Sequence, residues 1–452
     1  MLLNRLINKT LKYGSRFMVF IHFTWPLVFV YSKMIKEIKS EKGLNNHAGF
    51  TILALMPKRF VGDLEVLAEN GEFRILAIPF DWQTKILSLY WNDRFDSTIY
   101  THKEGSSNKM IIEVQRKLRC FMKCFLSSLY RKIGVDCVIG SGIFYRQNYD
   151  WGLVSNEIGI PYIVLHKENL INSRIHRRNY EIAKRNNRFQ GAHIIVHNTI
   201  LRDIFIKAGY VRPEQISSLG CLRMDGFVQR VKKQIKINNK RKKVVLFSFS
   251  YNTGLGADIK SFTENRDVGV VNLFEHVHVS IAKLAMKNKE VDFVIKAKWG
   301  GNWLREIEFV CKKNGIVTKE LENLSVLHDV NVHNLIFESD VVCVYGSTTA
   351  LESAIAAKPV IVPYFDEALK PEYADGVHHK DYFHLFDIAH SVEEFERLIV
   401  ERLANPAVSE DCINERYAVF EKYVSSMKGN AREQYIGLIK KIVKESKWDH
   451  NL

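Results

Sequence analysis

The feature that most constrains the fold is a repeated alternation of short apolar runs with helical stretches. Five such runs, rich in β-branched and aromatic residues, begin at positions 50, 73, 135, 162 and 193. Five more begin at 244, 292, 324, 341 and 359. Continuous apolar runs separated by helices are typical of parallel strands buried on both faces. The sequence therefore predicts an α/β protein with two doubly wound, Rossmann-like domains.

A polar, lysine-rich stretch separates the two series and sets the expected domain boundaries. It covers residues 232–243 and is interpreted as a solvated linker. The expected division is a basic and apolar segment at 1–45, an N-terminal domain at 46–231, a C-terminal domain at 244–405 and helices at 406–452. Because ligands of such sheets bind beyond the carboxyl ends of the strands, we expect functional side chains directly after the apolar runs.

The segment 341–365 predicts a strand, a glycine turn and a helix that begins with hydroxyl groups. Gly346 permits a sharp turn, and the hydroxyls are those of Ser347, Thr348 and Thr349. A helix start offers unpaired N–H groups and a partial positive charge, which favour phosphate. Glu352 follows one turn later and is a candidate acceptor for a ribose diol. The alternative is that these residues only cap the helix, with Ser347 as the N-cap.

Two further segments of the second series carry polar groups at a strand end. Lys296 and Lys298 are two residues apart, so they are expected on the same side of the strand. Two neighbouring ammonium groups favour an anion such as a donor phosphate or a sugar carboxylate, unless both are simply solvated. Ser248 and Ser250 lie in the glycine-containing segment "SFSYNTG" and are candidate hydrogen-bond donors to the same ligand.

The first series contains two candidate carboxylates. "LHKE" ends a strand with His166, Lys167 and Glu168, and "GCLRMDGF" contains Arg223 and Asp225. Two carboxylates in different environments suit glycosyl chemistry, where one acts as acid or base and the other as nucleophile or charge stabiliser. An arginine can bind a carboxylate or phosphate with two hydrogen bonds. The alternative in both segments is an ordinary salt bridge.

The charge of the chain narrows the classes of partner. Lys plus Arg number 65 against 50 Asp plus Glu, a formal net charge of +15, which favours anionic partners. The basic runs lack the aromatic pattern of RNA-binding modules, so we expect no nucleic-acid partner. Seven cysteines without a C-x-x-C pair fit a reduced cytosol, and neither they nor the histidines form a metal-binding pattern. We expect no metal.

An apolar stretch at 17–32 lies between basic residues on both sides. It is short for a spanning helix and contains His22 and Pro26. This pattern predicts that the N-terminal segment lies on an anionic bilayer surface. A buried N-terminal helix and, less favoured, a membrane-spanning one are the alternatives.

Several of these segments resemble one group of bacterial enzymes. "GCLRMDGF" resembles the G-x-x-R-x-D motif of surface-polysaccharide GT-B transferases and CDP-glycerol glycerophosphotransferases. "FVIKAKWG" and the segment 338–367 resemble their lysine-ending strand and their nucleotide-binding strand–turn–helix. "LHKE" is similar to the acidic strand end of the Kdo transferases that make capsule and O-antigen chains. The resemblance covers about residues 160–370 as short motifs.

The resemblance implies a GT-B architecture, with two domains facing a cleft, and a role in bacterial surface-polysaccharide synthesis. It implies a cytidine nucleotide donor, CMP-Kdo, and a lipid-linked or oligosaccharide acceptor. The enzyme would work at the cytoplasmic face of the inner membrane, without a further cofactor. A CDP-glycerol-type polyol-phosphate transferase and a nucleotide-sugar epimerase of the same fold are alternatives. The first is weakened because Lys298-Trp299 stands where that branch typically has His-Pro.

The resemblance also implies roles for the candidate residues. Asp225 would be the nucleophile and Glu168 the acid or base, assisted by His166. The donor would be held by Arg223 and by the residues of the second series, with the hydroxyl turn on its phosphate and Glu352 on its ribose. Those residues are Ser248, Ser250, Lys296, Lys298, Ser347, Thr348, Thr349 and Glu352.

Overall fold

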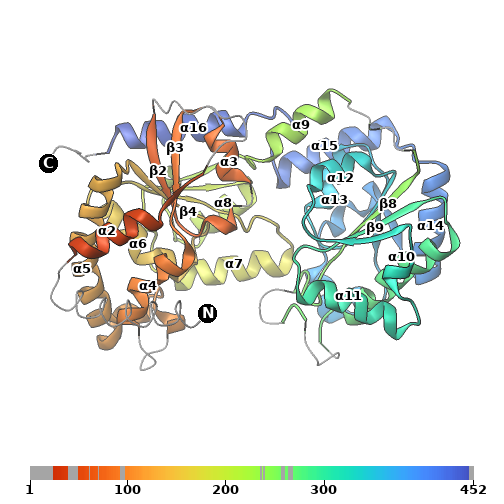
Figure 1. Ribbon diagram of the computed structural model, residues 1–452, viewed down its shortest axis with the longest axis horizontal. Coiled ribbons are helices and arrows are strands. Elements are labelled where there is room, and N and C mark those ends of the chain that lie inside the picture. The colour runs from red at the N-terminus through yellow and green to blue at the C-terminus, as the bar shows by residue number, and fades with distance from the viewer. Residues whose placement is uncertain are drawn as a thin grey trace. The chain divides into compact units, whose positions relative to one another are not determined.

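The computed structural model describes residues 24–446 except 39–48, 61, 70, 92–96, 235–236, 238–239, 256–259 and 263–267. The chain divides into two compact units. Unit 1 consists of residues 1–169, 180–225 and 430–452, and unit 2 of residues 170–179 and 226–429. Each unit contains its own β-sheet (Figure 1).

Unit 1 is built on a seven-stranded sheet with the order β1-β3-β2-β4-β5-β6-β7. Its strands are β1 (Lys36–Glu37), β2 (Phe50–Ala54), β3 (Phe73–Ala77), β4 (Cys137–Gly140), β5 (Tyr162–Leu165), β6 (His193–Val196) and β7 (Ile216–Ser218). Every pair is parallel except β1 with β3. The five predicted strands are confirmed, and the two short strands at the edges were not predicted.

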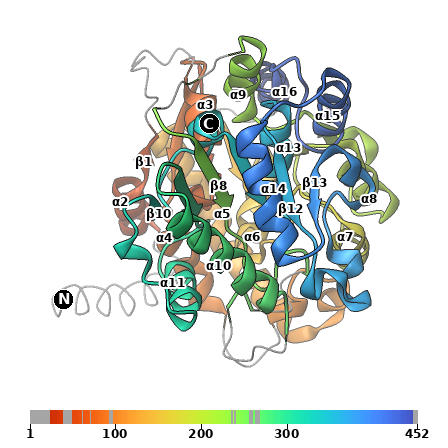
Figure 2. The same cartoon turned by 90° about the vertical axis from the view of Figure 1, so that its right-hand side faces the viewer.

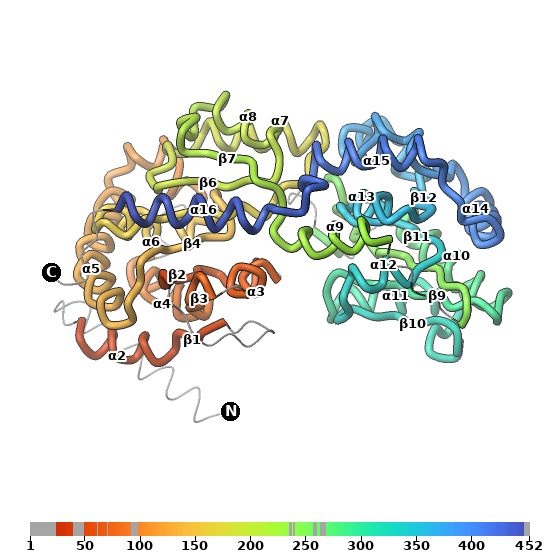
Figure 3. The backbone as a smooth tube through the Cα atoms, turned by 90° about the horizontal axis from the view of Figure 1, so that it is seen from above, coloured from red at the N-terminus to blue at the C-terminus, as the bar shows by residue number. Residues whose placement is uncertain are grey.

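Helices cover both faces of this sheet. They are α2 (Trp25–Met34), α3 (Asp63–Ala68), α4 (Phe80–Tyr90), α5 (Lys109–Ile133), α6 (Arg146–Glu157), α8 (Thr199–Lys207) and α16 (Ala431–Lys444), together with the last part of α7 (Ser173–Arg185). Alternate strand residues such as Ile52 and Ile139 pack with Leu64 of α3 and Ile439 of α16 in one buried cluster. The C-terminal helix α16 therefore covers the first sheet (Figure 3).

Unit 2 has a six-stranded parallel sheet with the order β10-β9-β8-β11-β12-β13. Its strands are β8 (Lys243–Phe247), β9 (Asp292–Lys296), β10 (Leu324–Leu327), β11 (Val341–Val344), β12 (Val360–Pro363) and β13 (Asp387–Ala389). This is the strand order of a dinucleotide-binding Rossmann sheet. All five predicted strands are confirmed, and β13 is a short edge strand that was not predicted.

The helices of unit 2 also lie on both faces of the sheet. They are α9 (Met224–Lys232), α10 (Val271–Lys287), α11 (Asn302–Lys313), α12 (Val332–Glu338), α13 (Thr349–Ile355), α14 (Val392–Ala404) and α15 (Glu410–Tyr423). The helices α10 and α14 pack together on one face of the sheet (Figure 2), and α12 and α13 pack together on the other. Both units are therefore doubly wound, as the sequence predicts.

The two units differ from the expected division in three places. Residues 170–179, expected in the N-terminal domain, belong to unit 2, and the boundary between residues 225 and 226 falls inside α9 and not in the predicted linker at 232–243. The predicted C-terminal helical region is also divided, because α15 belongs to unit 2 and α16 to unit 1. The physical reason is that one side of α16 is apolar, and the core of the first sheet buries it.

The helix α2 lies at the surface of unit 1. Leu27, Val28 and Tyr31 face inward, whereas Trp25 and Phe29 are 69% and 47% exposed. The remaining part of the predicted apolar segment, residues 17–23, lies outside the described residues. Among the residues that the structure describes, no helix is long and apolar enough to cross a membrane.

Candidate functional site

The strand order indicates where each sheet binds a ligand. In open parallel sheets this is the crevice at the carboxyl ends of two neighbouring strands whose connections run in opposite directions. In unit 1 these strands are β2 and β4, and in unit 2 they are β8 and β11. The segments that follow β8 and β11 contain six of the twelve predicted residues, whereas the predicted residues of unit 1 follow β5 and β7.

A buried charge pair lies at this edge of unit 1. Asp63 begins α3, shortly after β2, and forms an ion pair with Lys167, which follows β5. Both side chains are less than a tenth exposed. The other carboxylate oxygen of Asp63 accepts a hydrogen bond from the backbone N–H of Arg223 at 3.2 Å. Asp63 thus joins the two predicted segments "LHKE" and "GCLRMDGF", although it was not predicted from the sequence.

Positive charge gathers around this pair. Burial lowers the pKa of the Lys167 ammonium to about 8, and the charge of Arg223 acts in the same direction. Burial also lowers the pKa of His197 well below its ordinary value, with further lowering by Lys167 and Arg223. His197 is therefore neutral at neutral pH, and the Lys167 ammonium is already paired with Asp63.

Glu168 is the exposed carboxylate of the cluster. Its Oε1 accepts a hydrogen bond from the phenol of Tyr145 at 3.1 Å. Burial, reinforced by the charge of Glu168, raises the pKa of Tyr145 to about 12. Tyr145 therefore keeps its proton at neutral pH and acts as a fixed donor to Glu168.

His166 has a different environment from Glu168. It is buried against Phe205, and its Nδ1 has no hydrogen-bond partner among the described residues. Burial lowers the pKa of His166 to about 4, so the ring is neutral at neutral pH. A neutral imidazole can orient a neighbouring group or accept a proton, but it does not supply the positive charge of an imidazolium.

Asp225 is engaged elsewhere in unit 1. Its two carboxylate oxygens accept hydrogen bonds from the backbone N–H groups of Ala431, at 3.0 Å, and Arg432, at 2.7 Å. These are the first residues of α16, and Asn430 before them provides no side-chain cap. Asp225 thus caps α16 from a neighbouring helix. Its role as a nucleophile stays a prediction.

In unit 2 the turn after β11 lies against the loop after β8. Gly346 has a φ of +63°, and a Cβ atom at this position would stand 2.3 Å from Cγ2 of Thr253. A glycine is therefore required for both the backbone conformation and the close approach. The helix α13 begins at Thr349, later than predicted, and Ser347 accepts a hydrogen bond from the N–H of Thr349 at 3.3 Å.

The hydroxyl groups of this turn have different partners. Thr348 donates to the buried carboxylate of Glu352 at 2.9 Å, and His333 lies 3.6 Å from the same carboxylate. The hydroxyl of Thr349 is buried and has no partner among the described residues. Of the two threonines, Thr349 is therefore the one whose hydroxyl makes no hydrogen bond to the described residues.

The two predicted lysines have different environments at the end of β9. Lys296 is its last residue, is buried, and donates from Nζ to the carbonyl oxygen of Ala297 at 2.7 Å. Its pKa is lowered by burial and by the charge of Lys298, against the influence of Asp329. Lys298 lies beyond the strand and is exposed. Only Lys298 presents its charge to solvent.

The two predicted serines make internal hydrogen bonds. Ser248 accepts from the indole N–H of Trp303 at 2.7 Å and lies 2.8 Å from Nε2 of His278. Ser250 donates to Oδ1 of Asn252 at 2.7 Å. Both hydroxyls hold the loop after β8 in place, and their predicted contact with a donor stays a prediction.

Asn172 is a residue of this edge that sequence reasoning missed. Its side-chain amide donates to the carbonyl oxygens of Gly254, at 3.1 Å, and Gly376, at 2.7 Å. It also lies 3.3 Å from Nε2 of the buried His378. Asn172 thus ties the loop after β8 to the segment after β12. Its sequence neighbours give no signal, because all these contacts are long-range.

Comparison with known proteins identifies the fold of the chain. The sequence matches no protein-family model and no curated protein. Among solved structures, a putative UDP-N-acetylglucosamine 2-epimerase from Listeria monocytogenes matches with a TM-score of 0.50 and 10% identity, over 89% of this chain and 98% of that one. The chain has a GT-B fold.

Two further GT-B structures are similar at lower scores. The UDP-GlcNAc 2-epimerase from Neisseria meningitidis bound to UDP-GlcNAc has a TM-score of 0.48 and 13% identity, over 87% of this chain and 100% of that one. A glycosyltransferase from Rickettsia africae has a TM-score of 0.44 and 12% identity, over 88% and 100%. At such identities the likeness concerns the fold alone.

Proposed function

We propose that this GT-B protein is a glycosyltransferase of bacterial surface-polysaccharide synthesis. It would move a sugar from a nucleotide donor to a glycan acceptor. The observation that carries the proposal is the contact of the Gly346 turn with Thr253 where β8 and β11 meet, with the Thr349 hydroxyl left without a partner among the described residues. A phosphate in this crevice would accept hydrogen bonds from that hydroxyl and from the N–H groups of the turn.

The donor we propose is a cytidine nucleotide, CMP-Kdo. The support is the resemblance of "LHKE" to the acidic strand end of Kdo transferases. The segment 338–367 resembles the nucleotide-binding strand–turn–helix of the wider group of surface-polysaccharide GT-B transferases and CDP-glycerol glycerophosphotransferases. The sugar of this donor carries a carboxylate, which suits the exposed Lys298 of unit 2.

Glu168 is the group best suited to acid–base chemistry in unit 1. As a base it would take the proton of the acceptor hydroxyl while that oxygen bonds to the anomeric carbon. The bond from this carbon to the phosphate oxygen breaks, and its electron pair leaves with CMP. This direct displacement needs no covalent intermediate. An attack by Asp225 would require its carboxylate to leave the start of α16.

The exposed face of α2 supports a membrane location for this reaction. Trp25 and Phe29 stack at 6.3 Å, and the ammonium groups of Lys33 and Lys132 lie 5.8 and 5.7 Å from the centre of the Phe29 ring. The first 36 residues contain no acidic residue. Aromatic and basic groups together favour an anionic lipid surface, where a lipid-linked acceptor would be held.

A second candidate is a nucleotide-sugar epimerase. The observation in its favour is the similar Listeria structure, which is described as a putative UDP-N-acetylglucosamine 2-epimerase. An epimerase would convert a UDP-sugar without an acceptor, so the two functions differ in nucleotide and in product.

The reaction products separate these functions. The full chain is incubated with CMP-Kdo or with UDP-GlcNAc, with a membrane extract as the source of acceptor, and products are followed by NMR and mass spectrometry. The proposal expects CMP release that depends on the extract, with Kdo recovered on a glycan. Conversion of UDP-GlcNAc to its C2 epimer without extract would establish the epimerase instead.

A further inference from the structure

Three loops of unit 1 each bring one side chain to the carboxyl ends of β2, β4 and β5. Arg59 ends the short 3-10 turn after β2, Tyr145 lies after β4 and directly precedes α6, and Glu168 follows β5. The strands β2 and β4 border the crevice where an open parallel sheet of this order binds its ligand. Arg59 and Tyr145 were not predicted to bind a ligand.

These side chains form a chain of contacts. The guanidinium of Arg59 lies over the Tyr145 ring, with its central carbon 5.3 Å from the ring centre. The phenol of the same ring donates to Oε1 of Glu168 at 3.1 Å. The Tyr145 ring therefore sets the distance between a guanidinium and a carboxylate, and one sugar residue with its substituents is long enough to bridge it.

Both charged groups are open to solvent. Arg59 and Glu168 are exposed, whereas Tyr145 between them is half-buried. Within the part of the chain that the structure describes, the Arg59 guanidinium makes no hydrogen bond and no ion pair, with Glu168 or with any other acid. A guanidinium in this state can hold a carboxylate or a phosphate with two hydrogen bonds.

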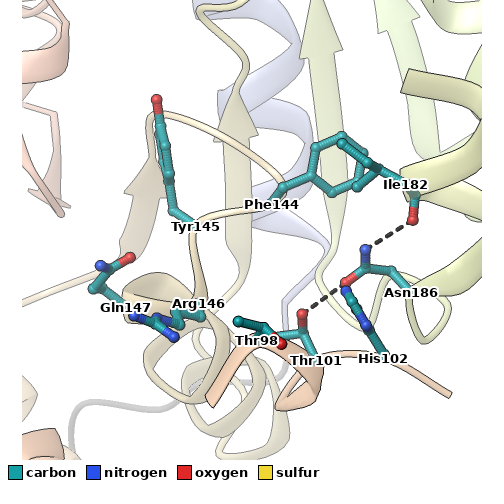
Figure 4. Close-up of a pocket in the computed structure, with 9 residues that line it drawn as sticks. All are labelled: Thr98, Thr101, His102, Phe144, Tyr145, Arg146, Gln147, Ile182 and Asn186. Atoms are coloured by element: carbon teal, nitrogen blue, oxygen red, sulfur yellow. Dashed lines mark hydrogen bonds between the residues drawn. The ribbon is translucent and has the colours of Figure 1, made fainter. Parts of the chain in front are cut away.

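The Tyr145 ring is held against the backbone of its own loop. A Cβ atom at Gly142 would stand 2.5 Å from Cε2 of this ring, so a larger residue there would displace the ring. Tyr145 and Phe144 are neighbours in the sequence, but their rings point apart (Figure 4). Phe144 packs against Phe205 of α8, with 5.8 Å between the ring centres. The position of the Tyr145 ring is therefore fixed by local packing.

A buried glutamine joins the loops that follow β2 and β4. The side chain of Gln83, in α4, is fully buried, and its Oε1 accepts a hydrogen bond from the backbone N–H of Met56 at 3.0 Å. Its Nε2 donates to the carbonyl oxygen of Gln147 at 3.1 Å and to Oδ1 of Asn148 at 2.7 Å. The two loops are therefore arranged before a ligand binds, which lowers the entropic cost of binding.

The charges define how a ligand would lie on these side chains. An anion is attracted by the guanidinium of Arg59 and repelled by the carboxylate of Glu168, so it belongs on the Arg59 side. A hydroxyl suits Glu168, because an ionised carboxylate only accepts hydrogen bonds. The matching ligand therefore carries an anion at one end and a hydroxyl at the other.

We propose that Arg59, Tyr145 and Glu168 form the acceptor site for an anionic sugar residue, with its carboxylate or phosphate on Arg59 and its reacting hydroxyl on Glu168. The proposal rests on the glycosyltransferase function proposed above and specifies its acceptor class. Because Glu168 is exposed, the hydroxyl contacts the carboxylate directly. Arg59 selects the acceptor, and Tyr145 is a positioning residue for both charged groups.

Binding of simple sugars, measured without any nucleotide, tests the site directly. The probes are methyl α-glucuronide and glucose 6-phosphate, with methyl α-glucoside as the neutral match, titrated into the full chain and followed by NMR. We expect at least one anionic probe to bind about tenfold more tightly than the glucoside, the factor of one charge-assisted hydrogen bond. Which probe binds distinguishes a carboxylate from a phosphate.

Variants of the basic turn decide whether the preference belongs to Arg59. Arg59→Gln should abolish it, and Arg59→Lys should keep part of it. Lys58→Gln removes the neighbouring exposed cation and is the matched control, which should keep most of the preference. Equal affinity for all three probes, or a preference that Arg59→Gln leaves intact, would overturn the proposal.

A variant of Glu168 tests whether the anion and the carboxylate share one site. Glu168→Gln removes the opposing charge, so at low salt the anionic probe should bind about threefold more tightly, the factor for two unit charges about 6 Å apart in water. The affinity for the glucoside should stay unchanged. An anionic probe that gains nothing from Glu168→Gln would contradict the shared site. Because no donor is present, these results are independent of whether the chain transfers CMP-Kdo.

Discussion

At the scale of single residues, the function depends on which polar groups are already engaged. Ser248 and Asp225 make hydrogen bonds that hold structure together, whereas Glu168 is exposed and Thr349 has a buried hydroxyl without a partner among the described residues. Residue type and spacing in the sequence identify all four as candidates. They do not show that Asp225 lies beside the start of α16, because the two are about 200 residues apart.

Asp225→Ala should destabilise the protein by about 1 kcal/mol, because the N–H groups of Ala431 and Arg432 lose their cap. Urea unfolding measures this change. Asp225→Asn keeps an acceptor oxygen and should recover much of the stability. An Asp225→Asn variant that is stable, binds nucleotide and does not transfer would point to the nucleophilic role. Normal transfer would leave only the capping role.

Glu168→Gln tests the acid–base assignment. The amide keeps the shape of the side chain and can still accept from Tyr145, but it cannot take a proton. Turnover should fall at least about a hundredfold, while nucleotide affinity changes little. Steady-state kinetics with a calorimetric control measures both quantities. Unchanged turnover would remove Glu168 from the chemistry.

At the scale of elements, α16 and α2 show what a helical pattern leaves open. The sequence predicts a helix near residue 440, but periodicity does not say which sheet it covers. In the structure Tyr435 donates to the carbonyl oxygen of Gly220 at 2.9 Å, and Ile439 lies in the core of the first sheet. The sequence pattern of α2 likewise does not decide between a surface helix and a buried helix. In the structure only one side of α2 is buried.

The exposed side of α2 should bind anionic membranes. Flotation of the full chain with phosphatidylglycerol vesicles should fall as salt rises, and Trp25→Ser with Phe29→Ser should weaken it further. Phe309→Ser is a matched control, since Phe309 is 49% exposed in unit 2. Flotation that persists in carbonate would indicate insertion, and equal binding to neutral vesicles would contradict the electrostatic part.

At the scale of the whole molecule, the fold was more predictable than the site. All ten predicted strands are confirmed. Nine of them are central strands with largely apolar sequences, and the tenth, β10, lies at an edge of the second sheet. The edge strands β1, β7 and β13 have two or three residues and no such signal. The unit boundary inside α9 and the return of α16 depend on long-range packing, which composition does not reveal. Asp63 and Asn172 were missed for the same reason.

Buried histidines should make the stability of the whole chain depend on pH. Burial lowers the pKa of His166, His193, His278 and His379 to about 4. Histidines of the unfolded chain have a pKa of about 6.5. Between about pH 4 and pH 6.5 the unfolded chain therefore binds more protons than the folded chain. The free energy of unfolding should therefore be largest above about pH 6.5 and fall towards pH 4. Urea midpoints that do not change between about pH 7 and pH 5 would contradict this.

The most direct test of the central claim is calorimetric titration of the full chain with CMP and with UDP. The account predicts that CMP binds more tightly than UDP, and that Thr349→Ala weakens CMP binding about fivefold, the effect of one lost hydrogen bond. Thr199→Ala, in α8 of unit 1, should have no effect. Tighter binding of UDP, or CMP affinity that Thr349→Ala leaves unchanged, would contradict the assignment of a cytidine nucleotide to the turn after β11.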